Sequence, residues 1–97
     1  MPTYVLLIHW TEQGIKSYKD SVNRLEDFTR LAESMGGSVR ETLYTVGEYD
    51  LVTVTEFPDD ESATAAVLQA ASLGNVRTTT MRAFTADQMR DIISRTG

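Results

Sequence analysis

Thr3-Tyr4-Val5-Leu6-Leu7-Ile8-His9-Trp10 (TYVLLIHW) is the stretch that decides the fold of this chain. It is a short apolar run, rich in aromatic and branched side chains, and it predicts a β-strand. A strand with one face in water alternates apolar and polar residues. The four residues 5–8 are all apolar instead. We therefore expect this strand to be buried on both of its faces.

The rest of the chain alternates between helical and extended patterns. A helix is expected from Asp20 or Ser21 to Gly36-Gly37, and a second one opens at Pro58-Asp59-Asp60-Glu61 and ends at Gly74-Asn75. A capping-box pattern at residues 85–88 starts a short terminal helix that runs to about Arg95. The remaining strands are predicted over residues 39–46, 51–57 and 76–84, with a turn at 47–50.

Each of the two longer helices has one apolar face. In the first helix this face recurs at spacings of three and four, and it comprises Tyr18, Val22, Leu25, Phe28, Ala32 and Met35. The same pattern leaves Arg24, Glu26, Asp27 and Arg30 for solvent. The face of the second helix is made of small residues, namely Ala63, Ala66, Val67, Ala70 and Leu73.

The order of elements predicts an α+β, ferredoxin-like βαββαβ domain over residues 1–97, with a C-terminal helix added. Right-handed crossovers place both longer helices on one face of a four-stranded antiparallel sheet. The other face then lacks a cover, although Val5 and Leu7 point toward it. Burying each such side chain is worth about 1.5–3 kcal/mol, so we expect a homodimer in which two sheets face each other. The alternative is that the terminal helix, with Met89, Ile92 and Ile93, folds back over this face.

Alternation along the strands predicts which side chains share a face. Tyr4, Leu6, Ile8 and Trp10 are expected under the helices, together with Val52, Val54, Met81 and Ala83. The open face would then hold Val5, Leu7, Leu51 and Phe57 around six polar residues. These six are the candidate ligand-binding residues of a small-molecule chamber, namely His9, Thr53, Thr55, Thr78, Thr80 and Arg82.

Each candidate also has a structural interpretation. His9 is the only histidine and could transfer protons, but a structural or interface role is favoured over a catalytic one. The threonines are good strand formers whose hydroxyls can bond to each other. Arg82 could pair with an acidic residue across an interface, and Asp50 could cap backbone amides of its turn.

Composition excludes several classes of protein. The absence of cysteine rules out disulfides and thiolate metal sites, and no metal or cofactor is expected. Nine basic and fourteen acidic residues give a net charge of −5, which opposes binding to nucleic acid or to an anionic membrane. No apolar run is long enough to span a bilayer, and no secretory signal is recognised, so we expect a cytoplasmic protein.

Several short motifs identify a resemblance. They are Gly47-Glu48-Tyr49-Asp50, the opening Tyr4-Val5-Leu6-Leu7 with Trp10-Thr11-Glu12-Gln13-Gly14, and Leu73-Gly74-Asn75-Val76-Arg77-Thr78. Their order and spacing resemble the GYD family of small bacterial and archaeal proteins, from Pro2 to about Ile93. The resemblance implies a dimeric α/β-barrel whose protomers pair sheet to sheet. It implies no shared reaction and no catalytic residue set.

Three functions remain open. The first is binding of a small, partly hydrophobic metabolite in the cavity between the facing sheets. The second is a cofactor-independent isomerase or monooxygenase that uses His9 for proton transfer. The third is a ligand-free assembly or interaction module, for which the interior would be filled with side chains.

Overall fold

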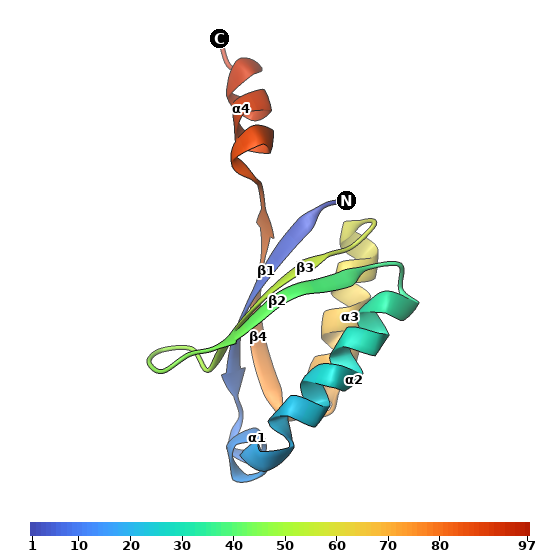
Figure 1. Ribbon diagram of the computed structural model, residues 1–97, viewed down its shortest axis with the longest axis vertical. Coiled ribbons are helices and arrows are strands. Elements are labelled where there is room, and N and C mark those ends of the chain that lie inside the picture. The colour runs from blue at the N-terminus through green and yellow to red at the C-terminus, as the bar shows by residue number, and fades with distance from the viewer.

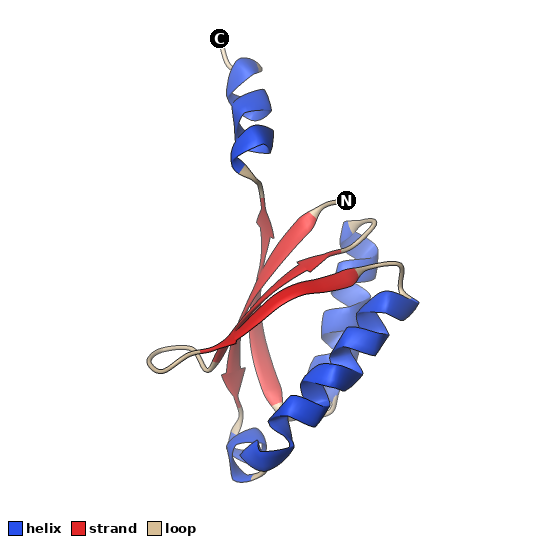
Figure 2. Cartoon of the chain, in the orientation of Figure 1, coloured by secondary structure: helices blue, strands red, loops and turns tan.

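The computed structural model describes all of residues 1–97. Its elements are, in order, β1 (Thr3–Trp10), α1 (Glu12–Lys16), a 3-10 turn (Tyr18–Asp20), α2 (Ser21–Ser34), β2 (Ser38–Tyr44), β3 (Leu51–Glu56), α3 (Asp60–Ser72), β4 (Val76–Ala83) and α4 (Ala86–Ser94). The four strands form one antiparallel sheet in the order β2-β3-β1-β4. Helices α2 and α3 lie side by side against one face of this sheet (Figures 1 and 2). The predicted ferredoxin-like fold is confirmed.

Local chemistry explains most of the element boundaries. The Asp59 carboxylate caps α3 by accepting a hydrogen bond from the Ser62 backbone N–H at 2.7 Å, and this bond lowers the pKa of Asp59. Thr85 and Gln88 form the predicted capping box of α4. The chain leaves α2 through Gly36, whose φ of 80° suits glycine. The short helix α1 was not predicted, because residues 11–14 look like a simple break after β1; Thr11 caps its start.

The predicted faces of β1 are correct, but those of β3 are reversed. Leu6 of β1 pairs directly with Thr53, so both side chains point toward the helices. The side chains of β3 that are buried there are Leu51, Thr53 and Thr55, and Phe57 follows them just after the strand. Val52 and Val54 point to the open face instead. The error has a physical cause, since the large Leu51 and Phe57 fill the core while the intervening threonines bury their hydroxyls in hydrogen bonds.

The faces predicted for β4 are also reversed by one residue. Thr80 pairs with Leu6 and Arg82 pairs with Tyr4, so these side chains share the helix side of the sheet with Thr78. Met81 lies opposite Val5 on the open face. Because β4 is an edge strand whose residues are largely exposed, its hydrophobicity carries little information about its register.

The predicted inner face of the first helix needs two corrections. Tyr18 is 54% exposed because it belongs to the 3-10 turn before α2, so it does not continue the helical phase of α2. Val22 is 56% exposed because it follows the buried Ser21, and each step along a helix turns the side chain by roughly 100°. Leu25, Phe28 and Ala32 lie on the inner face as expected.

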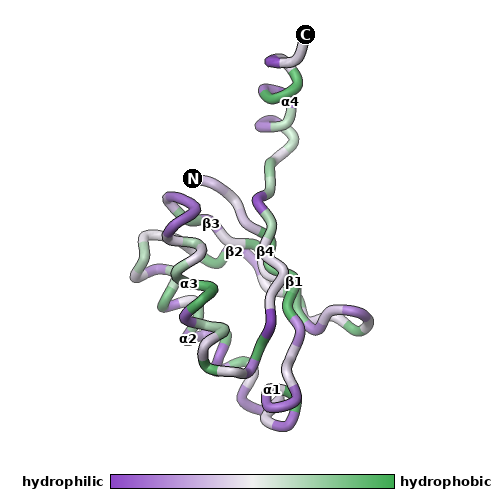
Figure 3. Tube along the Cα trace, turned by 180° about the vertical axis from the view of Figure 1, so that it is seen from behind, coloured by the Kyte–Doolittle hydropathy of each residue, from purple (hydrophilic) through white to green (hydrophobic).

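One face of the sheet has no cover. Its apolar side chains come from all four strands and are Val5, Leu7, Leu43, Val52, Val54 and Met81. Helix α4 does not fold back over them; it continues the direction of β4 and stands away from the body (Figure 1). The alternative in which the terminal helix covers the open face is therefore wrong. Figure 3 shows that α4 itself carries hydrophobic residues, and Met89 and Ile93 are exposed. No helix is both long and apolar enough to cross a bilayer.

A hydrogen bond between Tyr4 and Asp60 ties the start of β1 to the start of α3. The Tyr4 side chain is buried, and its hydroxyl donates to the Asp60 carboxylate. Burial and the neighbouring negative charge of Asp60 raise the pKa of Tyr4 to about 12. The neutral hydroxyl is thus the form that stabilises the fold.

Replacing Tyr4 with phenylalanine removes this bond and should lower the free energy of unfolding by about 1–2 kcal/mol. The wild type should also lose stability between pH 10 and 12, because there the unfolded tyrosine ionises while the folded one resists ionisation. Tyr4→Phe should lose less over that range. Urea unfolding across this pH range measures both effects. Tyr18→Phe, at an exposed tyrosine, is the control; an equal effect in both variants would contradict the assignment.

Candidate functional site

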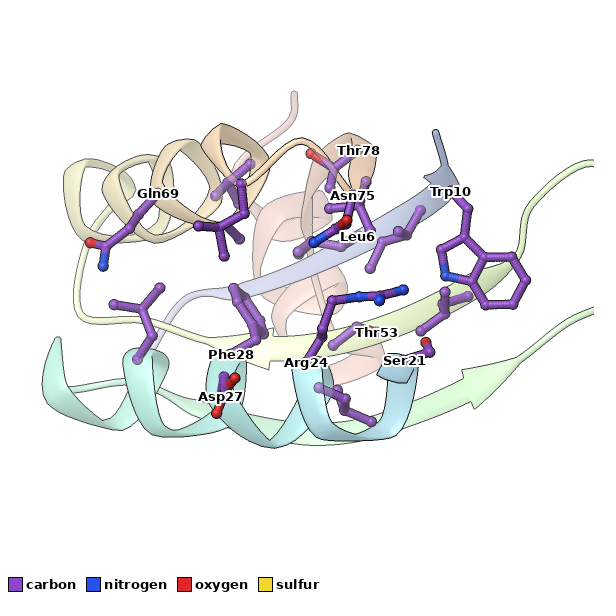
Figure 4. Close-up of a pocket in the computed structure, with 18 residues that line it drawn as sticks. Leu6, Trp10, Ser21, Arg24, Asp27, Phe28, Thr53, Gln69, Asn75 and Thr78 are labelled. Atoms are coloured by element: carbon purple, nitrogen blue, oxygen red, sulfur yellow. The ribbon is translucent and has the colours of Figure 1, made fainter. Parts of the chain in front are cut away.

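A cavity of about 230 Å³ lies between the sheet and helices α2 and α3 (Figure 4). Its floor is the helix-facing side of β1, β3 and β4, and consists of Leu6, Ile8, Trp10, Leu51, Thr53, Val76 and Thr78. Its walls come from α2, α3 and the turn after α3, and consist of Ser21, Arg24, Leu25, Asp27, Phe28, Leu31, Val67, Gln69, Ala70, Leu73 and Asn75. Eleven of these eighteen residues are hydrophobic, so the cavity is an apolar chamber with a few polar groups.

The cavity exists because only one end of the space under the helices is filled. At the start of α3, the ring of Phe57 packs with Ala32, Ala63 and Ala66, and all four side chains are almost fully buried. Toward the other end of α3 the sheet offers the smaller Thr53 and Thr78. The small residues of α3 cannot reach across the remaining gap. The same alanine face that packs tightly at one end therefore leaves space at the other.

The end of the cavity near Trp10 is held by contacts between α1 and the turn after α3. The Thr11 hydroxyl donates to the Gly74 carbonyl at 2.6 Å, and the Thr11 backbone N–H donates to the Asn75 carbonyl at 3.1 Å. The Gln13 amide donates to the Leu73 carbonyl and to the Asn75 side chain. At Gly14, a Cβ atom would lie 1.9 Å from the Asn75 carbonyl oxygen, so the approach of the two segments requires glycine. Residues 11–14 and 73–75, which belong to two of the short motifs, thus form one wall of the cavity.

Arg24 connects α2 to this wall. One guanidinium nitrogen, Nη1, donates to the carbonyl and the hydroxyl of Ser17 at 2.9 and 3.2 Å, and Nη2 donates to the Gly14 carbonyl at 3.3 Å. These acceptors lie at the C-terminal end of α1, where a cation is favoured by the helix dipole. Figure 4 shows the side chain reaching along the cavity toward Trp10.

The structure brings two of the six predicted ligand-binding residues into this cavity. Thr53 is buried, and its hydroxyl lies 3.3 Å from that of Thr42. Thr78 is half-buried, and its hydroxyl lies 3.4 Å from that of Thr80. Thr55 lies on the same side of the sheet, but its hydroxyl donates to the Tyr4 carbonyl at 3.1 Å and is outside the cavity. These hydroxyl contacts agree with the structural interpretation of the threonines.

Arg82 lies on the helix side of the sheet but away from the cavity. Its guanidinium carbon is 4.4 Å from the centroid of the Phe84 ring and 5.7 Å from that of Tyr4. These distances allow cation–π interactions with both rings. Arg82 also donates to the Thr3 carbonyl at 3.3 Å. Within the chain its partners are therefore aromatic rings and backbone carbonyls.

His9 is separated from the other five candidates because it points to the open face. Its ring packs against that of Tyr49 in the 47–50 turn, with centroids 4.6 Å apart and the ring planes tilted by 41°. In the same turn, the Asp50 carboxylate accepts a hydrogen bond from the Trp10 backbone N–H at 2.8 Å. We expected Asp50 to cap amides of its own turn, but it accepts a hydrogen bond from the backbone of the neighbouring strand β1 instead. No group of three or more His, Asp or Glu side chains is arranged to hold a metal ion.

Sequence reasoning missed Arg24, which it assigned to solvent. The side chain is half-buried at the cavity wall. A signal was present in the spacing, because Arg24 lies three residues after the buried Ser21 and four before Phe28, on the same side of the helix. The charge of arginine concealed this position, although its long stem can line an apolar surface.

Comparison with known protein families supports a single assignment. The model of the GYD domain matches residues 4–93. A protein of Thermus thermophilus, named glutamine synthetase and cystathionine beta-lyase binding protein, is 30% identical over 96 residues, which are 98% of each chain. The similarity therefore extends over nearly the whole length of both proteins.

Solved structures show the same fold. TTHA0845 from Thermus thermophilus is 30% identical, with a TM-score of 0.56 over 89% of this chain and 96% of that chain. FFRP-DM1 is 20% identical, with a TM-score of 0.62 over 87% of this chain and 100% of that one. A feast or famine regulatory protein of M. tuberculosis, complexed with L-methionine, is 16% identical with a TM-score of 0.64; the match covers 91% of this chain and 55% of that one. At these identities the last two show the fold alone.

Proposed function

This chain belongs to the GYD family, and from that premise we propose that it is a homodimeric protein that binds a small, partly hydrophobic molecule. The site is the cavity between α2, α3 and the sheet of each protomer. This location differs from the chamber between facing sheets that the strand pattern suggested. The cavity itself is the observation that carries the proposal, because a concave space lined mostly by apolar side chains with a few polar groups is the usual form of a small-molecule site.

The composition of the cavity suits an amphipathic ligand. Its floor and walls are mostly apolar, whereas Arg24, Asn75 and Thr78 offer polar groups toward one end. A volume of about 230 Å³ is below the ~300–1,000 Å³ typical of sites for drug-sized ligands. The ligand is therefore a small metabolite whose apolar body lies between Phe28 and the sheet.

The open face of the sheet supports self-association. It presents six apolar side chains, and those of β1 and β3 occupy its centre: Val5, Leu7, Val52 and Val54. A second sheet of the same kind is complementary to this surface, since an isologous contact matches one apolar patch with its own copy. The proposed dimer covers this face and leaves the cavity on the far side of each sheet.

The size of the exposed surface agrees with a missing partner. A compact monomer of 10.8 kDa exposes roughly 5,500 Å², whereas this chain exposes 6291 Å². Its radius of gyration is 14.5 Å, against roughly 12.5 Å for a compact domain of this length. The excess surface comes both from the helix α4, which stands away from the body, and from the uncovered face of the sheet.

His9 lies outside the cavity to which we assign the ligand. A proton-transfer group must reach the bound molecule directly or through one water. His9 points away from the cavity, on the opposite face of β1, and packs against Tyr49. We therefore do not assign a reaction to this residue.

A second candidate function is binding to another protein. It is favoured by the name of the Thermus relative, which describes that protein as binding glutamine synthetase and cystathionine beta-lyase. In this chain, α4 stands away from the body and exposes Met89 and Ile93 on an amphipathic helix. A helix of this kind can insert its apolar side into a groove of a partner.

Occupancy of the cavity can be measured through Trp10, the only tryptophan, which lines it. Titration with 1-octanol and with octanoate should change its fluorescence saturably for at least one of the two. Ala70→Leu fills part of the cavity and should weaken that binding about tenfold, or ~1.4 kcal/mol. Ala65→Leu, on the exposed side of α3, should leave it unchanged. Failure of both probes to bind would overturn the proposed function.

Sedimentation equilibrium of the wild type at micromolar concentration should give about twice the protomer mass of 10.8 kDa. Leu7→Asp places an unpaired charge in the proposed interface and should raise the dimer dissociation constant at least ~100-fold. Leu68→Asp adds the same charge at an exposed position of α3 and should leave the mass unchanged. A wild type that remains at the protomer mass would refute self-association.

Purified glutamine synthetase tests the second candidate. If α4 is the docking helix, labelled protein should sediment faster when the enzyme is added. Ile93→Asp should abolish the shift, because a charge replaces an exposed apolar contact. Ser94→Asp adds the same charge to the next residue of the helix and should retain the shift. A complex that forms equally with both variants would exclude α4 as the docking element.

A further inference from the structure

Arg24 carries a charge for which the chain supplies no counter-ion. The five ion pairs of the protein all join other side chains. The partners of the guanidinium are the neutral oxygens of Ser17 and Gly14. These contacts use three of its five N–H donors, so two remain without an assigned acceptor.

The surroundings of Arg24 make this free charge significant. The side chain is half-buried beside an apolar cavity, where electrostatic interactions are screened less than at an open surface. The only carboxylate among the lining residues is that of Asp27, which is exposed and paired with Arg30. The cavity thus has one uncompensated positive group at its wall.

We propose that the ligand of this cavity is a small monocarboxylate whose anionic group pairs with Arg24 and whose apolar body lies over Leu6 and Phe28. This inference rests on the proposed ligand-binding function and specifies its chemical class. The planar fork of a guanidinium matches a carboxylate, and an ionised acceptor forms a stronger hydrogen bond than a neutral one. A single negative charge balances Arg24, whereas a phosphate group of about −2 leaves an excess of negative charge beside Asp27.

The proposed role of Arg24 in ligand binding is additional to its contacts with α1. Those contacts hold the guanidinium from one side and so orient it before any ligand arrives. A group that is already oriented loses less conformational entropy on binding. The residues that connect α1 to the turn after α3 therefore also position the charge at the end of the cavity.

Octanoate and 1-octanol have the same apolar chain and differ in charge, so they separate this inference from the proposed function. Trp10 fluorescence should show that octanoate binds the wild type about tenfold or more tightly than 1-octanol. Arg24→Gln should weaken octanoate binding by a similar factor, so that the affinities for octanoate and 1-octanol become nearly equal. Added salt should weaken only the binding of octanoate.

Two further variants control for local unfolding. Arg90→Gln removes a positive charge from α4, outside the cavity, and should leave both affinities unchanged. Arg24→Lys keeps the charge without the planar fork and should give an intermediate affinity for octanoate. If both probes bind the wild type equally and Arg24→Gln changes neither, the monocarboxylate inference fails while the cavity remains a binding site. Tighter binding of octyl phosphate than of octanoate would also overturn it. If neither probe binds, the proposed function fails first.

Discussion

The structure depends on the apolar character of β1 on both of its faces. This strand is one of the two central strands of the sheet, and it pairs with β3 on one side and β4 on the other. Its even-numbered residues, Tyr4, Leu6 and Ile8, anchor the layer of helices, and Val5 and Leu7 give the open face its apolar character. Because consecutive side chains of a strand point in opposite directions, these two requirements are met by alternate residues. The cavity and the proposed dimer surface therefore lie on opposite sides of the same strand.

The short motifs that characterise the chain have identifiable structural roles. Residues 11–14 and 73–75 interlock through hydrogen bonds and through the close approach at Gly14. In the 47–50 turn, Asp50 accepts a hydrogen bond from the N–H of Trp10 at the end of β1, and Tyr49 packs against His9. All of these contacts converge on the same end of β1, next to the polar end of the cavity. A short motif can thus have a structural role, here closing one end of a chamber, without taking part in a reaction.

The division of the molecule into two faces also separates its proposed activities. Ligand binding belongs to the helix side, where Arg24 and Trp10 lie. Self-association belongs to the other side, together with His9. Helix α4 extends away from the sheet and provides a third surface. Consecutive side chains of a strand point to opposite faces of the sheet. A substitution on one face therefore need not alter the chemistry of the other.

Several features of this protein followed from its residues alone. The element order, the capping box at Thr85, the ferredoxin-like topology and the apolar character of both faces of β1 depend on local patterns, and local patterns are readable in a sequence. The site was predicted less well, since only Thr53 and Thr78 of the six candidate residues line the cavity and Arg24 was assigned to solvent. Only the tertiary structure decided which side of β3 and β4 faces the helices. Threonine and valine occupy alternate positions of β3 and have similar shapes, so hydrophobicity did not distinguish the two faces. The pairing of Leu6 with Thr53 and Thr80 distinguishes the two faces, because residues paired across strands point to the same side of the sheet.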